Sequence, residues 1–405
     1  MWRFYRSVCL IWDLIIKKDL EDLENVIEQK NCERKVNLDL SVTLKIKILL
    51  LGFGIAINTG CGVNDVELEL LATNTQTDTA TTQPTRTSLP ATQTDTPTLP
   101  ATATLTSTPE PTSTTDPLSK YTIEHLSSRS YGGGELKIEE TLEDNAYFTR
   151  YLFSYPSDGL TIYGFMNLPK QGTPPFPVVI ASHGYINPTV YNTIDYTTRY
   201  ADSLSISGYL VLHPNLRGYP PSDEGDNLFR VGMAVDVLNL IAIVQKTGGR
   251  SDFLGSADPT RIGLWGHSMG GGVSLRVIVV NPDVNAAILY GSMSGDERQN
   301  FEAILEWSEG ERGNAELSVP DKDLSRISPI FHLERIQAAV AVHHGEADDT
   351  VPLEWSLDFC EILDVLGKTI ECYTYPGQPH TFRGEGEQLF MHRAVDFFDT
   401  YVKDK

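Results

Sequence analysis

The chain has 405 residues and a formal net charge of −22, from 54 acidic and 32 basic side chains. This acidic balance argues against nucleic acid as a partner, because phosphate binding needs clusters of basic residues. The five cysteines have no metal-ligand spacing, and glycine motifs for phosphates or dinucleotides are missing, so the sequence predicts neither a metal nor an organic cofactor.

The N-terminal part holds a candidate export signal. Residues 1–41 are mixed in character and carry no functional interpretation. In 42–61, two lysines precede about twelve mostly apolar residues, then small residues and Cys61, which is typical of a lipoprotein signal with a lipidated cysteine. Asn58 stands where leucine is usual, and the segment lies far from Met1. The alternatives are a short buried helix or an uncleaved anchor.

The composition of residues 62–117 predicts a tether. From position 72 onward this segment is dominated by Thr, with Pro, Ala, Ser, Gln and Asp, and it has almost no large apolar residue. Such a composition cannot bury a core, so we expect it to be disordered and partly extended. A tether after a lipidation site predicts an exported domain held at a membrane surface, although an inert spacer has the same composition.

Residues 118–405 have the composition of one folded domain in which apolar strands alternate with amphipathic helices. This alternation predicts a mostly parallel sheet covered on both faces, and the early hairpin strands predict an antiparallel edge. The predicted strands are 136–139, 147–155, 161–168, 177–182, 209–213, 262–265, 286–290, 338–343 and 369–375. The predicted helices are 197–207, 228–245, a helix that follows the tight turn 266–270 and ends at 280, 297–309, 353–366 and 388–402.

The turn after the strand 262–265 carries the main chemical signal. Ser268 lies in the frame Gly266-x-Ser268-x-Gly270, the pattern of a nucleophile elbow. A strained turn exposes the serine, and side chains in place of the two glycines would collide with the strand and the helix. The alternative is a glycine-rich strand-to-helix turn without chemistry.

A nucleophilic serine needs a base and an acid that orients the base. His380 follows the last predicted strand and is the candidate base, whereas His392 lies inside the closing helix. Asp348 follows the strand 338–343 and is the candidate acid, with Asp349 as the alternative of a turn or helix-cap carboxylate.

An oxyanion hole needs two backbone N–H groups. We expect one from Met269, directly after the serine, and one from Tyr185, after Gly184 in the loop that follows the strand 177–182. Gly184 is otherwise a plain turn residue. Arg217 follows the strand 209–213 and is expected to be a buried ion-pair anchor rather than a substrate contact.

The segment 292–331 interrupts the alternation of strands and helices. An insertion of this size at the carboxyl edge of a parallel sheet would overhang the site, so we predict a lid or cap that shapes the substrate pocket. A surface excursion without a role is the alternative.

Together these residues resemble the α/β-hydrolase superfamily and, within it, the catalytic domain of the prolyl oligopeptidase family. The resemblance covers about 151–405 and rests on these motifs: His183-Gly184, Arg217-Gly218-Tyr219, Gly266-His267-Ser268-Met269-Gly270, Ser328-Pro329, His344-Gly345 with Asp348 and Val351-Pro352, and His380. It implies an α/β-hydrolase fold and a Ser-Asp-His triad. True oligopeptidases of this family carry a β-propeller before the catalytic domain, and the roughly thirty residues between the tether and the hydrolase core are too few for one.

The expected activity is hydrolysis of an ester or amide through an acyl-enzyme. The main hypothesis is a serine peptidase acting on short peptides, and the alternative is a carboxylesterase acting on small or sugar-linked esters. A non-catalytic surface binding module is a remote third reading. Cys360 and Cys372 flank a helix-to-strand turn and form either a disulfide or two buried thiols. The sequence does not determine the oligomeric state.

Overall fold

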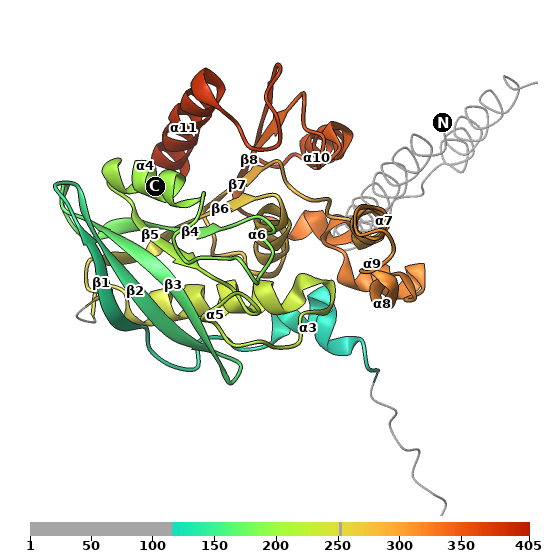
Figure 1. Ribbon diagram of the computed structural model, residues 1–405, viewed down its shortest axis with the longest axis horizontal. Helices are drawn as coiled ribbons and strands as arrows, with labels where there is room; N and C mark the ends of the chain where they lie inside the picture. Colours follow the sequence, from blue (N-terminus) through green and yellow to red (C-terminus); the bar gives the residue numbers. More distant parts are fainter. Residues whose placement is uncertain (1–115, 251–252) are drawn as a thin grey trace, which may run out of the picture. The chain divides into compact units, whose positions relative to one another are not determined.

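The computed structural model describes residues 116–250 and 253–405, which belong to one folded unit (Figure 1). The predicted signal with Cys61, the N-terminal extension 1–41 and nearly all of the tether 62–117 lie outside the described residues. The structure therefore describes essentially the domain that the sequence predicted from residue 118 onward.

A nine-stranded sheet forms the centre of the domain, in the order β1-β2-β3-β5-β4-β6-β7-β8-β9. Its strands are β1 (Lys137–Asp144), β2 (Phe148–Ser157), β3 (Leu160–Pro169), β4 (Phe176–Ser182), β5 (Leu210–Pro214), β6 (Ala257–His267), β7 (Ala286–Tyr290), β8 (Ala339–Gly345) and β9 (Ile370–Tyr375). The first three strands pair antiparallel with one another, and β3 pairs antiparallel with β5. From β5 to β9 every pairing is parallel, which confirms the predicted parallel sheet and its antiparallel edge.

The parallel strands are apolar because helices cover both of their faces. Every residue of β4, β5, β7 and β8 is buried. A strand buried on both faces has no reason to alternate polar and apolar residues, which is why these strands read as continuous apolar runs. All four were predicted from the sequence to within two residues at each end.

Two helix pairs cover the two faces of the sheet (Figure 1). One pair is α4 (Thr198–Ile206) with α11 (Gly384–Phe398), and the other is α5 (Val231–Thr247) with α6 (Met269–Val280). Residues 228–247 are long and apolar enough to cross a membrane, but 78% of that stretch is buried, as in a core helix. On the face of α4 and α11, Trp265 packs in one aromatic cluster with Tyr200, Tyr290 and Phe390.

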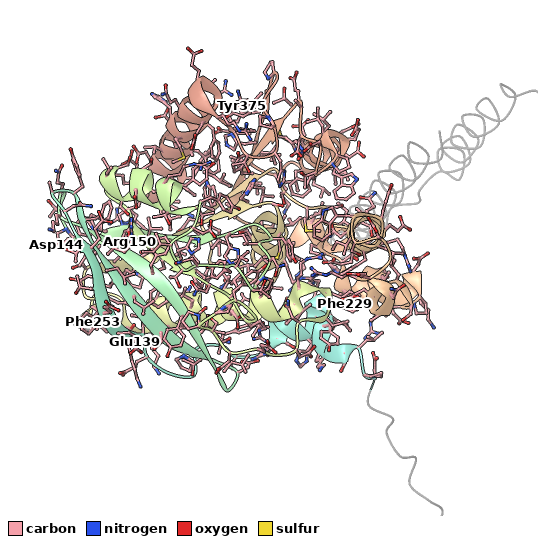
Figure 2. All side chains as sticks on the ribbon, in the orientation of Figure 1. Glu139, Asp144, Arg150, Phe229, Phe253 and Tyr375 are labelled. Carbon is pink, nitrogen blue, oxygen red and sulfur yellow. A yellow bond between two sulfur atoms is a disulfide. The ribbon has the colours of Figure 1, made fainter. Side chains whose placement is uncertain are left out.

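The largest differences from the predicted bounds concern two strands and a helix. The strand β1 runs to Asp144 rather than ending at 139, β6 begins at Ala257 rather than 262, and α11 spans Gly384–Phe398 rather than 388–402. The short helix α3 (Ile123–Ser128) has no predicted counterpart. β1 is mostly exposed and charged, so its sequence lacks the apolar run that marks a strand. It is held instead by pairing with β2, where Arg150, labelled in Figure 2, lies. Arg150 forms ion pairs with Glu143 of β1 and Asp202 of α4.

The segment 292–331 folds into short helices between β7 and β8. They are α7 (Glu297–Trp307), α8 (Asn314–Leu317) and α9 (Asp321–Ile327), followed by a 3-10 helix, Pro329–Arg335. Glu297 forms buried ion pairs with Arg276 of α6 and with Arg230. These two ion pairs anchor the start of the segment to the domain. Phe301 adds an edge-to-face contact with Phe229, labelled in Figure 2.

A disulfide joins Cys360 of α10 (Leu353–Val365) to Cys372 of β9. The structure thus supports the first of the two alternatives that the sequence left open.

We expect the domain to lose stability in mild acid because three of its histidines are buried. Burial lowers the pKa of His213, His267 and His343 from 6.5 to about 3. Between about pH 6.5 and pH 3 the unfolded chain binds these protons and the folded chain does not. As the pH decreases through this range, each histidine therefore lowers the free energy of unfolding by about 1.4 kcal/mol per pH unit. Urea unfolding at pH 8, 6 and 5 measures this change. An unfolding free energy that stays constant over this range would contradict it.

Candidate active site

Ser268 occupies a strained turn between β6 and α6. Its backbone angles are φ 55° and ψ −115°, in a region that residues with a side chain rarely adopt. The turn is held on both sides: the Ser268 N–H donates to the Tyr290 carbonyl at 2.9 Å, and the Ser268 carbonyl accepts from Met293 N–H at 3.1 Å. The sequence and the backbone therefore agree on a serine presented at the apex of an elbow.

The glycines around the elbow are required by close backbone approach. A Cβ on Gly270 would lie 2.2 Å from the carbonyl oxygen of Ser182, and one on Gly266 would lie 2.3 Å from the carbonyl oxygen of Gly270. A Cβ on Gly184 would lie 3.1 Å from the Ser268 Cβ. The β4 loop can therefore approach the serine this closely because these positions lack side chains.

The carboxylate of Asp348 and the imidazole of His380 are in contact. His380 Nδ1 lies 2.7 Å from Asp348 Oδ2, while Asp348 Oδ1 accepts from the N–H groups of Thr350 and Val351, both at 2.9 Å. The Asp348 side chain is 0% exposed. Asp349 is exposed, and its carboxylate accepts from the Thr350 hydroxyl at 3.2 Å. Of the two candidate acids, Asp348 is the one that contacts the histidine.

The surroundings of Asp348 favour its ionised form. Burial alone raises the pKa of this carboxyl, but hydrogen bonds from His344 and His380 outweigh burial and hold the pKa well below its usual range. His344 Nε2 lies 3.2 Å from Asp348 Oδ2, and its other nitrogen is 2.7 Å from the Ser356 hydroxyl. Asp348 is thus a buried carboxylate that stays charged and can orient a histidine.

His380 lies in the loop after β9 and lines the same pocket as Ser268. Gly291, at φ 49°, makes room for it, since a Cβ there would lie 3.2 Å from His380 Nδ1. His392 lies on α11, is 75% exposed, and pairs with Asp396 at 2.8 Å. The structure therefore brings His380, and not His392, together with the serine and the carboxylate.

A hydrogen-bonded chain that was not predicted connects the β4 loop to the loop of His380. The Gly184 N–H donates to the Tyr196 hydroxyl at 2.8 Å, and that hydroxyl lies 2.7 Å from His267 Nδ1. His267 Nε2 lies 3.0 Å from the His380 carbonyl oxygen. The hydroxyl therefore donates to Nδ1, and the neutral ring donates through Nε2. His267 is the variable residue before Ser268 in the elbow motif. Its position next to the serine was the only feature of the sequence that could have pointed to this role.

The two candidate oxyanion donors border the serine. Met269 is the first residue of α6, so its N–H has no acceptor within the helix. Tyr185 follows Gly184 and lines the pocket with Ser268. This is the arrangement in which two backbone N–H groups can face one developing oxyanion.

Arg217 forms the buried ion pair that the sequence suggested. Its Nη2 lies 2.7 Å from Asp236 Oδ1, its backbone N–H donates to Asp236 Oδ2 at 2.9 Å, and its Nη1 donates to the Asp226 carbonyl at 2.9 Å. Asp236 also accepts from the Ser157 hydroxyl at 2.6 Å. Arg217 thus ties the loop after β5 to α5, with one edge at the pocket.

The pocket above Ser268 has a volume of about 630 Å³ and walls that are mostly apolar. The segment 292–331 supplies one wall, which consists of Met293, Phe301, Ala303, Ile304, Trp307, Arg312, Gly313 and Glu316. Trp307 is 62% exposed, so a large part of its indole ring is open at this wall. The segment predicted as a lid thus borders the candidate site.

A serine, a carboxylate and a histidine that follow one another in this order, each after a parallel strand, define an α/β-hydrolase. The described domain has that fold. The chain belongs to the prolyl oligopeptidase family, whose model matches residues 201–405. All described strands form a single sheet, so the part of the chain that the structure describes contains no β-propeller.

The chain is similar in sequence to curated peptidases and in fold to solved structures of a peptidase and an esterase. A probable dipeptidyl-aminopeptidase B of Aspergillus niger is 26% identical over 284 residues, covering 64% of this chain and 30% of the relative. An acylaminoacyl peptidase of Pyrococcus horikoshii is 21% identical with a TM-score of 0.52, over 64% of this chain and 43% of that one. Acetyl xylan esterase 1 of a Thermoanaerobacterium species is 16% identical with a TM-score of 0.52, over 69% and 92% of the two chains. The matched part is thus less than a third of the first relative's length.

Proposed function

We propose that this protein hydrolyses short peptides through an acyl-enzyme formed on Ser268. The observation that carries the proposal is the 2.7 Å contact between the buried Asp348 and His380, which lines the same pocket as the strained Ser268. Membership of the prolyl oligopeptidase family and the dipeptidyl-aminopeptidase relatives support a peptide rather than another acyl substrate.

The reaction follows from the roles that the geometry permits. His380 takes the hydroxyl proton of Ser268 as the oxygen attacks the scissile carbonyl, and Asp348 stabilises the imidazolium. The N–H groups of Tyr185 and Met269 donate to the oxyanion. His380 then gives its proton to the leaving amine, which departs and leaves the acyl group on Ser268. A water molecule attacks this ester, with His380 again as the base, and releases the acid and the free serine.

The alternative is a carboxylesterase acting on small or sugar-linked esters, which uses the same triad. One observation favours it: the described strands form a single sheet and no propeller, and part of the pocket wall comes from the short segment 292–331. The likeness to an acetyl xylan esterase, most of whose length is matched, is consistent with this architecture.

Labelling and a substrate panel test these readings. We expect a fluorophosphonate to label the full chain at Ser268. If the folded protein is not labelled, the result would support the hypothesis of a non-catalytic binding module. Dipeptidyl and prolyl p-nitroanilides are then compared with p-nitrophenyl acetate and butyrate. Saturable cleavage of an anilide supports the peptidase, whereas cleavage of the esters alone would establish the carboxylesterase.

We also propose that the domain is exported and tethered to a membrane surface. The composition of 42–61 and 62–117 supports this, and so does the disulfide between Cys360 and Cys372, because disulfides persist in oxidising compartments. Fractionation of cells that express the full chain tests it. The wild type is expected in the membrane fraction and the Cys61→Ser variant in the soluble one, and equal distribution of the two would contradict lipidation at Cys61.

A further inference from the structure

His267 is the last residue of β6 and immediately precedes the nucleophile Ser268. It is 2% exposed and does not line the pocket, so it is not placed to contact a substrate there. Its ring lies instead beside the ring of His380, with centroids 4.6 Å apart and an angle of 37° between the two planes. The residue before the nucleophile therefore packs directly against the candidate base.

The His267 ring is also hydrogen bonded to the backbone of the base. Its Nε2 donates to the His380 carbonyl oxygen at 3.0 Å, and in the described part of the chain no other hydrogen bond reaches the peptide groups of His380. Other bonds hold the neighbouring parts of this loop. The Gln378 carbonyl accepts a backbone N–H at 3.0 Å, and the Phe382 N–H donates to the Tyr290 hydroxyl. The loop is thus fixed two residues before and two residues after His380, and His267 fixes the base itself.

A contact at one atom does not fix the plane of an imidazole ring. Asp348 binds His380 at Nδ1, so the ring can still tilt about that contact and displace Nε2, which takes the proton from Ser268. The ring of His267 limits this tilt because it packs against the ring of His380, and its bond to the carbonyl limits movement of the backbone. Such alignment matters because small displacements of a reacting group cost large factors in rate.

The hydrogen bonds of His267 also define its own protonation state. The Tyr196 hydroxyl accepts the Gly184 N–H, so its own proton goes to His267 Nδ1. The ring proton is then on Nε2, facing the His380 carbonyl. Burial lowers the pKa of His267 to about 3, which is consistent with a neutral ring. A neutral ring does not repel the imidazolium that forms when His380 takes the serine proton.

We propose that His267 is a positioning residue that aligns the imidazole of His380 with Ser268 for proton transfer. The inference rests on the proposed function, because it concerns the base of that reaction. His267 acts through His380 and not on the substrate. The end of β6 thereby carries the nucleophile and, one residue earlier, the ring that holds the base.

Two variants that retain different ends of the ring's hydrogen bonding test the proposal, with the best substrate of the panel. In His267→Gln, the amide nitrogen can take the place of Nε2 and donate to the His380 carbonyl. In the shorter His267→Asn, the amide reaches the place of Nδ1 and leaves that carbonyl without a donor. We expect His267→Asn to lower kcat about tenfold with little change in KM, since this factor corresponds to one hydrogen bond of ordinary strength. His267→Gln should recover most of that loss.

The matched controls are His343→Asn and His343→Gln. His343 is also buried, its Nδ1 lies 2.8 Å from the Tyr375 hydroxyl, and it does not line the pocket. These substitutions should lower the Tm and leave kcat at the wild-type level. Thermal unfolding of every variant establishes that it is folded at the assay temperature.

A measurement on the wild-type chain tests the inference without relying on the folding of any variant. Histidine-selective NMR at neutral pH should show that the His267 ring is neutral and carries its proton on Nε2. A proton on Nδ1 instead would leave no donor for the His380 carbonyl, and an imidazolium would repel the protonated base. Either result would overturn the inference.

Each kinetic outcome also supports or overturns the inference. An unchanged kcat in folded His267→Asn would overturn it, and so would equal losses in His267→Asn and His267→Gln or equal losses in the His343 controls. A loss confined to KM would overturn it and assign His267 to substrate binding. If the wild type neither reacts with the fluorophosphonate nor turns over the panel, the proposed function fails and the inference fails with it. An active wild type with an unaffected His267→Asn variant overturns the inference alone.

Discussion

Replacement of Ser268 by alanine is expected to lower kcat by about a million-fold and to abolish fluorophosphonate labelling. The reason is that Ser268 Oγ supplies the bond on which the acyl-enzyme depends, and the strained turn offers no second nucleophile at the apex. Substrate binding should change little, because the pocket walls remain in place. Initial rates at saturating substrate and intact mass after labelling measure both effects.

The matched control for this loss is Ser203→Ala. Ser203 lies on α4, and its hydroxyl donates to the Arg199 carbonyl at 3.1 Å. Its removal should leave both kcat and labelling at the wild-type level. Thermal unfolding of each variant establishes that it is folded. Substantial activity in a folded Ser268→Ala variant would contradict the assignment of the nucleophile.

Asp348→Asn is expected to lower kcat by about ten-thousand-fold while KM stays near its wild-type value. An asparagine amide facing His380 can donate to Nδ1, which places the imidazole proton on Nε2, where it blocks the removal of the serine proton. The ionised carboxylate prevents this, and its pKa, held low by His344 and His380, keeps it ionised at neutral pH. Steady-state kinetics at neutral pH measure the change.

Asp349→Asn is the control, and it also decides between the two carboxylates that the sequence left open. Asp349 is exposed and accepts from the Thr350 hydroxyl, so its charge is not needed to orient His380. We expect its kcat to remain close to that of the wild type. A larger loss in Asp349→Asn than in Asp348→Asn would contradict the assignment of the acid.

The parts of the fold that the sequence predicted well are those whose signal is local. The strands β4, β5, β7 and β8 read as apolar runs because both of their faces are covered, and their bounds came out within two residues. The edge strand β1 was misjudged in length because an exposed, charged strand is held by its partner rather than by burial. The helix α3 is six residues long, too short to show a helical period.

In the candidate site, too, the residues with a local signal in the sequence were predicted more easily than the others. Ser268 and its glycines were recognisable because the steric demands of a tight turn fall on positions next to one another in the sequence. His380 was found from its place after the last strand. The choice between Asp348 and Asp349 was harder, because adjacent residues point in different directions and only the folded loop shows which one contacts His380.

The sequence by itself determined the parallel sheet, the elbow and the order of nucleophile, acid and base, because periodicity and glycine sterics are properties of neighbouring residues. Only the tertiary structure revealed the chain from Gly184 through Tyr196 and His267 to His380, and the hydrogen bond from Arg312 to the Tyr185 hydroxyl. These contacts join residues up to 127 positions apart. Their formation depends on loop paths and side-chain directions set by the packing of the whole domain, which no local pattern encodes.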